Sequence, residues 1–314
     1  MSDVYSRVAV LVPCLDEEVT VGKVVDDFRR ALPGAVVYVY DNASSDSTAL
    51  VAAAHGAFVV HEPRRGKGNV VRSMFRDVEA DCYLMVDGDD TYPAESAPAL
   101  VAPVLNREAD MVVGDRIADG SCAAENKRPF HGLGNNLVRR AIKCAFGVSY
   151  GDVMTGYRAM SRDFVKTFPV LSDGFQVETE LSVHAADHRM RVVDVPVAYR
   201  DRPEGSASKL DTLSGGARVL AMIASMFRDY RPMAFFSLVS ALLLALGLAL
   251  GVPVVGEYMS SGVVERLPTA ILAAALVSLS ALSLACGLVL DSVAKSSRRQ
   301  WELEGYRVQA MPQG

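Results

Sequence analysis

The sequence predicts an α/β domain with a mainly parallel sheet, followed by a membrane-anchored helical hairpin. Short apolar runs alternate with segments of helical spacing between residues 8 and 197, and such alternation favours right-handed crossovers and parallel strands. Two later segments, 232–256 and 267–290, contain no charged side chain. Each is long enough, as a helix, to cross a hydrocarbon layer of ~30 Å.

The expected elements follow the order of the chain. Strands are expected at 8–12, 36–40, 58–60, 82–86, 110–113 and 192–197. Helices are expected at 19–32, before His55, between the third and fourth strands, at about 133–146, and after 175–180. The stretch 151–158 is rich in turn residues, and 118–130 is expected to be a loop over the site. The expected domain organisation is an α/β domain at 1–208, an amphipathic juxtamembrane helix at 209–231, the two transmembrane helices within 232–290, and a tail at 291–314.

The residues that flank the two apolar segments predict their orientation. Arg228 and Arg231 precede the first segment, Lys295 and Arg298 follow the second, and the loop between them carries two glutamates and one arginine. Because cytoplasmic loops are enriched in basic residues, we expect a multi-pass protein of the cytoplasmic (inner) membrane with both ends in the cytoplasm. No signal peptide is expected. The alternative is a buried core hairpin of a soluble protein.

Composition excludes little else. The net charge of -5 gives no support for nucleic-acid binding. The five cysteines lack metal-ligand spacing, so we interpret them as packing residues in a reducing compartment.

The stretch 87–90, Asp-Gly-Asp-Asp, follows the apolar run 82–86. Clustered carboxylates at the end of a buried strand repel one another, and a divalent cation would relieve that repulsion. Mg²⁺ and Mn²⁺ prefer oxygen ligands and often bind through one or two carboxylates and substrate phosphates. An acidic surface turn is the alternative, since Asp-Gly is a common turn dipeptide.

Polar clusters also follow two other predicted strands, at 16–18 and 41–46. In open parallel sheets ligands bind beyond the carboxyl ends of the strands, so the three clusters together predict a ligand site. The turn 64–69, Arg-Arg-Gly-Lys-Gly-Asn, is either a phosphate-binding turn at a helix start or a solvated basic turn. Glu180, His184 and His188 have a spacing that can bind a metal, but an exposed helix face explains it equally well.

This order of motifs resembles that of the GT-A-fold glycosyltransferases that transfer a sugar to a polyprenyl phosphate. The GT-A fold is Rossmann-like. Dolichol-phosphate mannose synthases and bactoprenol glucosyltransferases with two C-terminal transmembrane helices are the most similar groups. The resemblance rests on residues 12–17, 41–46, 66–68, 87–89, 155–158 and 202–209, together with the apolar hairpin.

The resemblance implies a donor site and a metal site. The donor nucleotide would contact Pro13, Asp16, Glu17, Asp41, Lys67 and Asp87. Asp87 and Asp89 match the D-x-D pair, which faces the ribose and the diphosphate bound to Mg²⁺ or Mn²⁺. Thr91 occupies the position at which the mannose synthases have a metal-binding Gln. The identity of the third protein ligand of the metal ion is therefore left open.

The resemblance also implies an acceptor site. Its phosphate-binding positions are Arg116, Arg128, Arg202, Ser206, Ser208 and Lys209, with Lys127 as an alternative to Arg128. Asp152 would be a general base in an enzyme that acts on a hydroxyl group. Here we expect it to orient the acceptor or contact the sugar, and a turn-stabilising side chain is the alternative.

The implied reaction is inverting, metal-dependent transfer of a hexose from a nucleotide-diphosphate sugar to polyprenyl phosphate. A UDP-glucose-like donor is favoured, with GDP-mannose and UDP-GlcNAc left open, and we expect a homo-oligomer. A processive polysaccharide synthase is disfavoured because the Q-x-x-R-W signature is absent and residues 298–301 have the wrong order. A sugar-phosphate transferase and a non-catalytic membrane-anchored scaffold are further alternatives.

Overall fold

The computed structural model describes residues 4–117, 129–174, 176–203 and 224–310. The chain divides into two compact units, one of residues 1–219 with 304–314 and one of residues 220–303. The predicted amphipathic helix 209–231 lies outside the described residues except for its last part, where 224–230 are helical.

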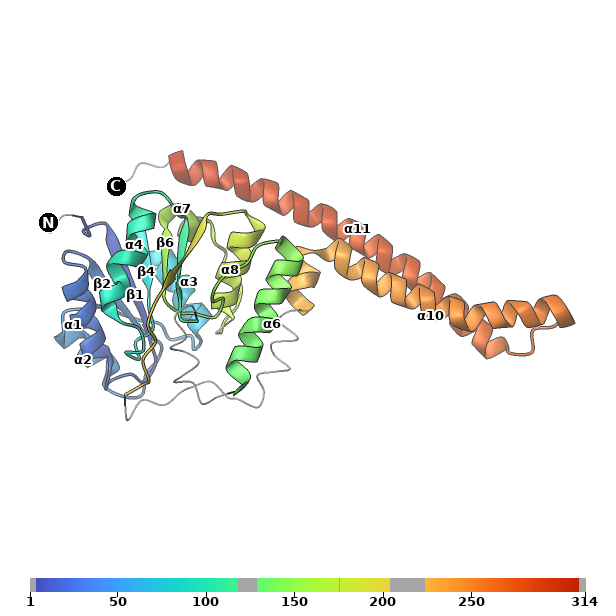
Figure 1. Cartoon of the computed structure of the whole chain (residues 1–314), viewed down its shortest axis with the longest axis horizontal. Coiled ribbons are helices and arrows are strands. Elements are labelled where there is room, and N and C mark those ends of the chain that lie inside the picture. Colours follow the sequence, from blue (N-terminus) through green and yellow to red (C-terminus); the bar gives the residue numbers. More distant parts are fainter. Residues whose placement is uncertain (1–3, 118–128, 175, 204–223, 311–314) are drawn as a thin grey trace. The chain divides into compact units, whose positions relative to one another are not determined.

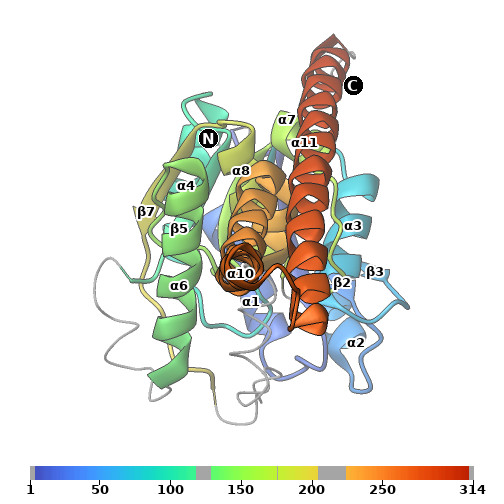
Figure 2. The same cartoon turned by 90° about the vertical axis from the view of Figure 1, so that its right-hand side faces the viewer.

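The first unit is built on one sheet whose strand order is β3-β2-β1-β4-β6-β5-β7. β3 and β7 form its two edges (Figure 2). Every neighbouring pair is parallel except the two that involve β6. The strands are β1 (Val8–Cys14), β2 (Val36–Asp41), β3 (Phe58–His61), β4 (Cys82–Met85), β5 (Met111–Asp115), β6 (Arg158–Ser161) and β7 (Val192–Pro196).

The six predicted strands and the mainly parallel sheet are confirmed, but β6 was not predicted. It is four residues long and begins with an arginine, so it has no apolar run that would mark it in the sequence. It forms because β4 and β5 each offer it an antiparallel edge. A short sequence without an apolar run can therefore become an interior strand when its neighbours supply the hydrogen bonds.

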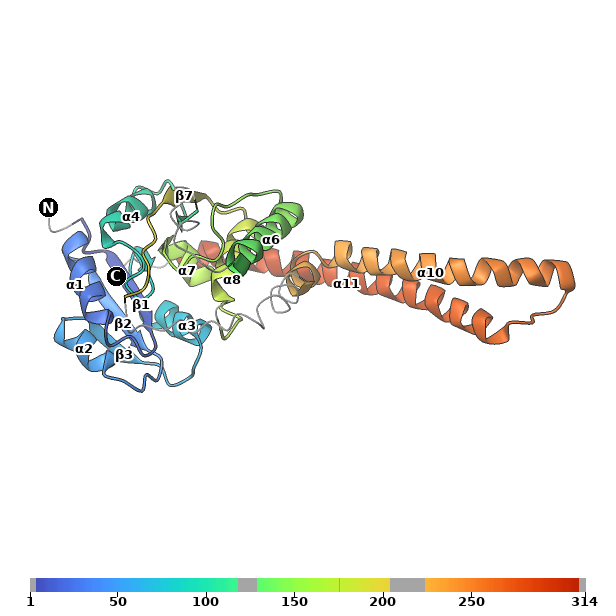
Figure 3. The same cartoon turned by 60° about the horizontal axis from the view of Figure 1, so that its bottom comes forward.

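Helices cover both faces of the sheet, as a buried parallel sheet requires (Figures 1 and 3). One face packs against α1 (Val21–Ala31), α2 (Thr48–Ala54) and α4 (Ala97–Leu105), and the other against α3 (Lys67–Asp77), α7 (Arg162–Thr167) and α8 (Val177–Asp187). The short helix η1 (Ala94–Ser96) and α6 (Pro129–Phe146) complete the unit. The sheet separates two hydrophobic cores, one on each face. Alternate residues of β1 point into one core or the other, so that Val10 faces α1 and Leu11 faces α3.

The direction of β6 decides which loops meet. All strands but β6 run the same way, so their carboxyl ends share one edge of the sheet. Because β6 runs the opposite way, its beginning lies at that edge, where Arg158 pairs with Met85 and Val113. The loop 151–157 before β6 therefore joins the loops that follow β1, β2, β4 and β5.

Most of the second unit is a hairpin of α10 (Pro232–Ser261) and the part of α11 (Leu267–Ala310) that ends at residue 303, and the two helices run side by side (Figures 1 and 3). Both helices are long and apolar enough to cross a membrane. Ser240 Oγ donates to the Ser280 carbonyl oxygen at 2.9 Å and so joins the two helices. Leucines on both helices are exposed, for example Leu238 and Leu282 at 63% and 60%, which disfavours a core hairpin of a soluble protein. The predicted tail is helical as far as residue 310.

Candidate active site

Asp89 lies in the loop after β4 and is buried, with 4% of its surface exposed. Its Oδ2 pairs with Arg202 Nη2 at 2.6 Å, and its Oδ1 accepts a hydrogen bond from Thr91 Oγ1 at 2.7 Å. Burial raises the pKa of Asp89, and the charge of Asp87 adds to that effect. The carboxylate is thus held in one orientation and compensated by a nearby cation.

Asp87 is fixed from two sides. Its Oδ1 accepts a hydrogen bond from Lys67 Nζ, and a Cβ at Gly156 would overlap its Oδ2. Lys67 also donates to Glu178 Oε1 at 2.5 Å. Burial alone would lower the pKa of Lys67, but Asp87 and Glu178 outweigh it and raise that pKa. Burial raises the pKa of Glu178, Asp87 adds to this, and Lys67 opposes it.

The loop itself is held close to β1 and α1. The Gly88 carbonyl accepts a hydrogen bond from Thr20 Oγ1 at 2.7 Å, and a Cβ at position 88 would lie 2.5 Å from Cys14 Sγ. Asp90 has a φ of 58° and pairs with Lys23 of α1 at 2.7 Å. Asp90 thus pairs with the neighbouring helix, and Asp87 and Asp89 are the two carboxylates of the loop that make up the candidate site.

The chemistry of the donor set fits a divalent cation. Asp87 and Asp89 supply hard oxygen ligands, and the Arg202 guanidinium already stands against Asp89 as a cation would. No group of three or more His, Cys, Asp or Glu side chains with metal-binding geometry occurs in the described part of the chain. In this geometry Thr91 donates to Asp89 and orients it, and its role as a metal ligand stays a prediction.

The loops after β1 and β2 interlock beside this acidic pair. Asp16 has a φ of 49°, and its Oδ1 accepts a hydrogen bond from the Ser45 N–H at 2.6 Å. The Glu17 N–H donates to Thr48 Oγ1 at 2.8 Å. Asp41 Oδ2 lies 3.1 Å from His61 Nδ1. Pro13 lies in β1 opposite Tyr40, so the predicted donor residues of β1 and β2 share one edge of the sheet.

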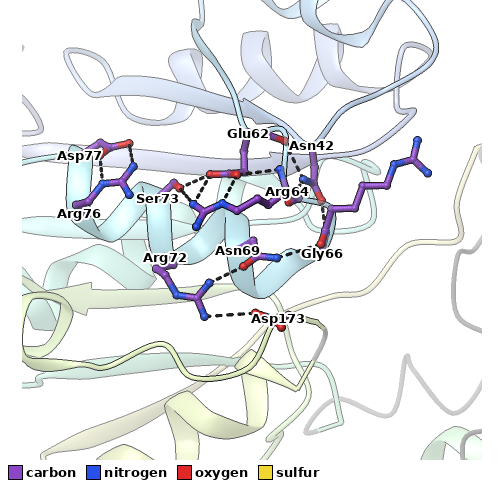
Figure 4. Close-up of polar contacts among 11 residues, drawn as sticks. Asn42, Glu62, Arg64, Gly66, Asn69, Arg72, Ser73, Arg76, Asp77 and Asp173 are labelled. Atoms are coloured by element: carbon purple, nitrogen blue, oxygen red, sulfur yellow. Dashed lines mark hydrogen bonds and ion pairs between the residues drawn. The ribbon is translucent and has the colours of Figure 1, made fainter.

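The basic turn 64–69 packs against the loop that contains Asp173 (Figure 4). Gly66 has a φ of 123°, and a Cβ on Gly66 or Gly68 would overlap the carbonyl oxygen of Asp173 or Ser172. The Gly68 N–H donates to the Asp173 carbonyl at 3.0 Å. These glycines thus admit the loop 172–173, and the donor contact of Lys67 stays a prediction.

A buried carboxylate supports the same turn. Glu62 accepts hydrogen bonds from Arg64 Nε at 2.8 Å and from Ser73 Oγ (Figure 4). The hydrogen bonds from Arg64 lower the pKa of Glu62 to about 2, although burial opposes this. Asn42 Oδ1 accepts from the Gly66 N–H at 2.7 Å, so the end of β2 is tied to the turn.

A cationic group lies on the other side of the acidic pair. Arg116 Nε donates to Asp152 Oδ2 at 2.6 Å, and Asp152 is fully buried. The Arg116 guanidinium stacks over Tyr199, 5.2 Å from the ring centre, and the rings of Tyr92 and Tyr199 lie 5.5 Å apart. Burial would lower the pKa of Arg116, but the neighbouring tyrosines and Asp152 raise it.

The two tyrosines connect this cation to the acidic loop. Tyr92 Oη accepts a hydrogen bond from the Gly156 N–H at 3.2 Å, beside Asp87. The Arg200 N–H donates to the Thr91 carbonyl at 2.9 Å, which ties the loop that carries Arg202 to the acidic loop. Asp87, Asp89, Arg116, Asp152 and Arg202 thus form one cluster. The structure brings these predicted residues together.

Sequence reasoning missed several residues of this cluster. Glu178 and Arg158 were assigned no role, because Glu178 lies among the polar residues of 176–180 and Arg158 begins a short strand, so no local pattern marks either side chain as buried. Arg158 is fully buried, and its guanidinium donates to the carbonyls of Thr155 and Val153 and to Ser182 Oγ. Burial lowers its pKa. Arg158 therefore holds the loop that carries Asp152.

Of the two interpretations of Glu180, His184 and His188, neither a metal site nor an exposed helix face is confirmed, because the described residues contain no such metal-binding group and His184 is buried. Glu180 accepts hydrogen bonds from the Ser172 N–H and hydroxyl at 3.0 Å, while His184 packs against Phe164 and Phe168. Burial lowers the pKa of His184 to about 3. The rings of His184 and His188 lie 4.2 Å apart, but Glu180 binds Ser172, so the three side chains do not converge. Arg128, Ser206, Ser208 and Lys209, and the loop 118–128, lie outside the described residues.

Comparison with known proteins gives one consistent family. Residues 9–168, about half of the chain, match the family described as Glycosyl transferase family 2. Glycosyltransferase AglJ of Haloferax volcanii is 34% identical over 80% of this chain and 82% of its own. A dolichyl-phosphate hexose transferase of the same organism is 29% identical over 68% of this chain and 91% of its own.

A solved structure shows the same fold. Glucosyl-3-phosphoglycerate synthase from Mycobacterium tuberculosis, in complex with Mn²⁺, UDP-glucose and phosphoglyceric acid, has a TM-score of 0.53 and 27% identity. The match covers 70% of this chain and 79% of that one. The same synthase has also been solved with Mg²⁺ and UDP.

Proposed function

Because the chain belongs to glycosyl transferase family 2 and is a glycosyltransferase, we propose that it transfers a hexose from a nucleotide-diphosphate sugar to polyprenyl phosphate. The observation that carries this proposal is the position of Arg116 and Arg202 beside the acidic pair, in a chain that also has two membrane-length apolar helices. The first arrangement suits two phosphate groups, and the second suits an acceptor dissolved in a membrane.

The donor would lie over the ends of β1, β2 and β4. Pro13, Asp16 and Glu17 would contact the nucleotide, and Asp41 would accept hydrogen bonds from the base. Asp87, held by Lys67, would face the ribose. A UDP-glucose-like donor is favoured because the solved relative binds UDP-glucose with Mn²⁺.

Asp89 and Asp87 would hold the divalent cation, Mg²⁺ or Mn²⁺, that the solved relatives carry. When bound there, such an ion supplies positive charge to the leaving diphosphate. The protein's part is to keep both carboxylates oriented. Thr91 does this for Asp89, and Lys67 with Gly156 does it for Asp87.

The acceptor needs little base catalysis. A phosphate monoester has its second pKa near ~6, so its oxygens are largely ionised at neutral pH. The harder task is to bring a dianion close to a second anionic group in line with the breaking bond. Arg116, oriented by Asp152 and by Tyr199, suits this task. The sugar is then transferred with inversion at the anomeric carbon.

Arg202 would serve in two positions. In the described structure it bridges Asp89 at 2.6 Å and Glu17 at 3.9 Å, between the acidic loop and the nucleotide loop. With Asp89 holding a divalent cation, Arg202 would bind a phosphate oxygen instead, together with Ser206, Ser208, Lys209 and Arg128.

The proposed location follows from the flanking charges. The catalytic unit and both termini would face the cytoplasm, and the hairpin would cross the membrane twice, which gives a cytosolic nucleotide sugar access to a membrane lipid. The product would serve cell-envelope glycan modification. A homo-oligomer remains part of the proposal.

One assay tests the reaction. Membranes that contain the protein are incubated with polyprenyl phosphate, Mg²⁺ or Mn²⁺, and a panel of labelled nucleotide sugars. We expect labelled lipid and a released nucleoside diphosphate, and no product from membranes that contain the Asp87→Ala or Asp89→Ala variant.

Other products would contradict the proposal. Release of a nucleoside monophosphate would indicate a sugar-phosphate transferase, and a growing glycan would indicate a processive synthase. Full function of both alanine variants would indicate a scaffold. Transfer to a soluble phosphorylated acceptor in place of the lipid would overturn the acceptor assignment.

A further inference from the structure

Glu178 is a buried carboxylate with no part in the proposed reaction. It lies in the first turn of α8, and its Oε1 accepts a hydrogen bond from Lys67 Nζ at 2.5 Å. The same ammonium group donates to Asp87 Oδ1. Lys67 thus joins two carboxylates that come from distant parts of the chain.

Stability alone does not account for this second carboxylate. Buried ions lose their hydration, and replacing a buried ion pair by apolar side chains is often neutral or stabilising. A pair of Lys67 and Asp87 would already be electrically balanced. With Glu178 present, the same ammonium contacts two carboxylates, those of Asp87 and Glu178.

The surroundings leave Asp87 little freedom. Lys67 holds Oδ1, while Gly156 lies so close to Oδ2 that a Cβ there would overlap it. Lys67 is itself only 9% exposed, and Glu178 is the second anchor of its ammonium group. Removing that anchor would let the ammonium move fully onto Asp87.

We propose that Glu178 is a positioning residue for Asp87. Acting through Lys67, it fixes the Asp87 carboxylate in the orientation in which it would bind the divalent cation of the donor complex. This inference rests on the proposed function, in which Asp87 and Asp89 hold that cation. It assigns to α8 a part in metal binding without any direct contact with the metal.

The test measures Mn²⁺ binding to the purified full-length protein by electron paramagnetic resonance, with UDP or GDP present and no lipid. Glu178→Gln keeps the shape of the side chain and removes its charge. Residues that support metal ligands typically contribute a factor of ~10 or more to affinity, so we expect Mn²⁺ to bind about tenfold more weakly. A thermal unfolding curve shows whether the variant is folded.

Glu180→Gln is the matched control. Glu180 lies on the same helix, but its carboxylate accepts hydrogen bonds from Ser172 and not from Lys67. We expect its Mn²⁺ affinity to stay within about twofold of wild type, as for substitutions away from the feature tested. An equal loss in both variants would overturn the inference, because the loss would then follow from any charge change on α8.

A double-mutant cycle identifies the route of the effect. Lys67→Met, alone and combined with Glu178→Gln, removes the ammonium that joins the two carboxylates, so the two variants differ only at position 178 and both lack the Lys67 contact to Asp87. If Glu178 acts through Lys67, the glutamine substitution causes no further loss in the Lys67→Met background. An equal loss in both backgrounds would overturn the inference.

The outcomes separate this inference from the proposed function. Wild-type affinity of Glu178→Gln, with Mn²⁺ bound by the wild-type protein, overturns the inference and leaves the function standing. Failure of the wild-type protein to bind Mn²⁺ with either nucleotide overturns both.

Discussion

At the residue scale, the candidate site is a set of buried charges that compensate one another. Asp87 and Glu178 share Lys67, Asp89 pairs with Arg202, and Asp152 pairs with Arg116. Arg158 adds a fourth cation, bound to backbone carbonyls and Ser182. Four carboxylates thus face four cations among these residues. A metal ion and a diphosphate that neutralise each other can enter such a site without leaving a net charge behind.

Gly156 provides the most local test of the acidic pair. Because a Cβ there would overlap Asp87 Oδ2, we expect Gly156→Ala to displace Asp87 and weaken Mn²⁺ binding in the presence of UDP by about tenfold. The overpacking should also lower the free energy of unfolding by about 1–3 kcal/mol. The two quantities can be measured by titration with Mn²⁺ and by denaturant unfolding.

Gly305→Ala is the control for this substitution, because nothing lies within 4 Å of a Cβ at position 305 of α11. It should leave Mn²⁺ binding unchanged. Unchanged Mn²⁺ binding in Gly156→Ala would contradict the assigned position of Asp87.

Asp152→Asn separates orientation from proton transfer. The substitution removes the buried ion pair with Arg116, so we expect the KM for lipid phosphate to rise and the free energy of unfolding to fall by about 3 kcal/mol. Turnover at saturating lipid phosphate should fall far less than the ~100-fold or more that loss of a general base costs. Steady-state kinetics give both values. A large loss of turnover with an unchanged KM would assign Asp152 to proton transfer.

Glu62 makes stability depend on pH. Its pKa is lowered to about 2 in the folded protein, so its contribution is complete above the ordinary value of 4.5 and is lost as pH falls from there towards 2. We expect Glu62→Gln to be less stable than wild type at pH 6, and the difference in unfolding free energy to shrink below pH 4.5. Unfolding curves at several pH values measure this difference between wild type and variant. A difference that stays constant with pH would contradict the lowered pKa of Glu62.

At the element scale, the loop after β7 carries the cation that occupies Asp89. Arg202→Gln removes this cation, so we expect Mn²⁺ to bind more tightly when no nucleotide is present. A partly exposed ion pair contributes ~1 kcal/mol at most, so the gain should be about fivefold or less. The same variant should show a higher KM for lipid phosphate, which the transferase assay measures.

Arg200→Gln is the control for Arg202→Gln. Arg200 lies on the same loop as Arg202, but it pairs with exposed Glu95 at 3.3 Å. Arg200→Gln should change neither the affinity for Mn²⁺ nor the KM for lipid phosphate. Weaker Mn²⁺ binding in Arg202→Gln would show that the arginine supports the metal and does not compete with it.

At the scale of the whole molecule, the charges around the hairpin predict its orientation. In a variant whose five cysteines are replaced by alanine, Ser261→Cys lies at the end of α10 and Ser296→Cys lies beyond the apolar part of α11. We expect a membrane-impermeant maleimide to label position 261 in intact cells and position 296 only after lysis. The reverse pattern would place the catalytic unit outside the cytoplasm.

The sequence by itself determined the strands that have apolar runs, the apolar hairpin and the polar strand ends, because periodicity and charge are local properties. It also determined Asp87 and Asp89 as a pair. The tertiary structure decided what surrounds them. Only the antiparallel pairing of β6 brings Gly156 to Asp87 and Asp152 to Arg116, and only the packing of α8 on α3 brings Glu178 to Lys67. The physical reason is that hydrogen bonds and ion pairs between distant segments depend on strand order and helix packing, which leave no periodic pattern in the sequence.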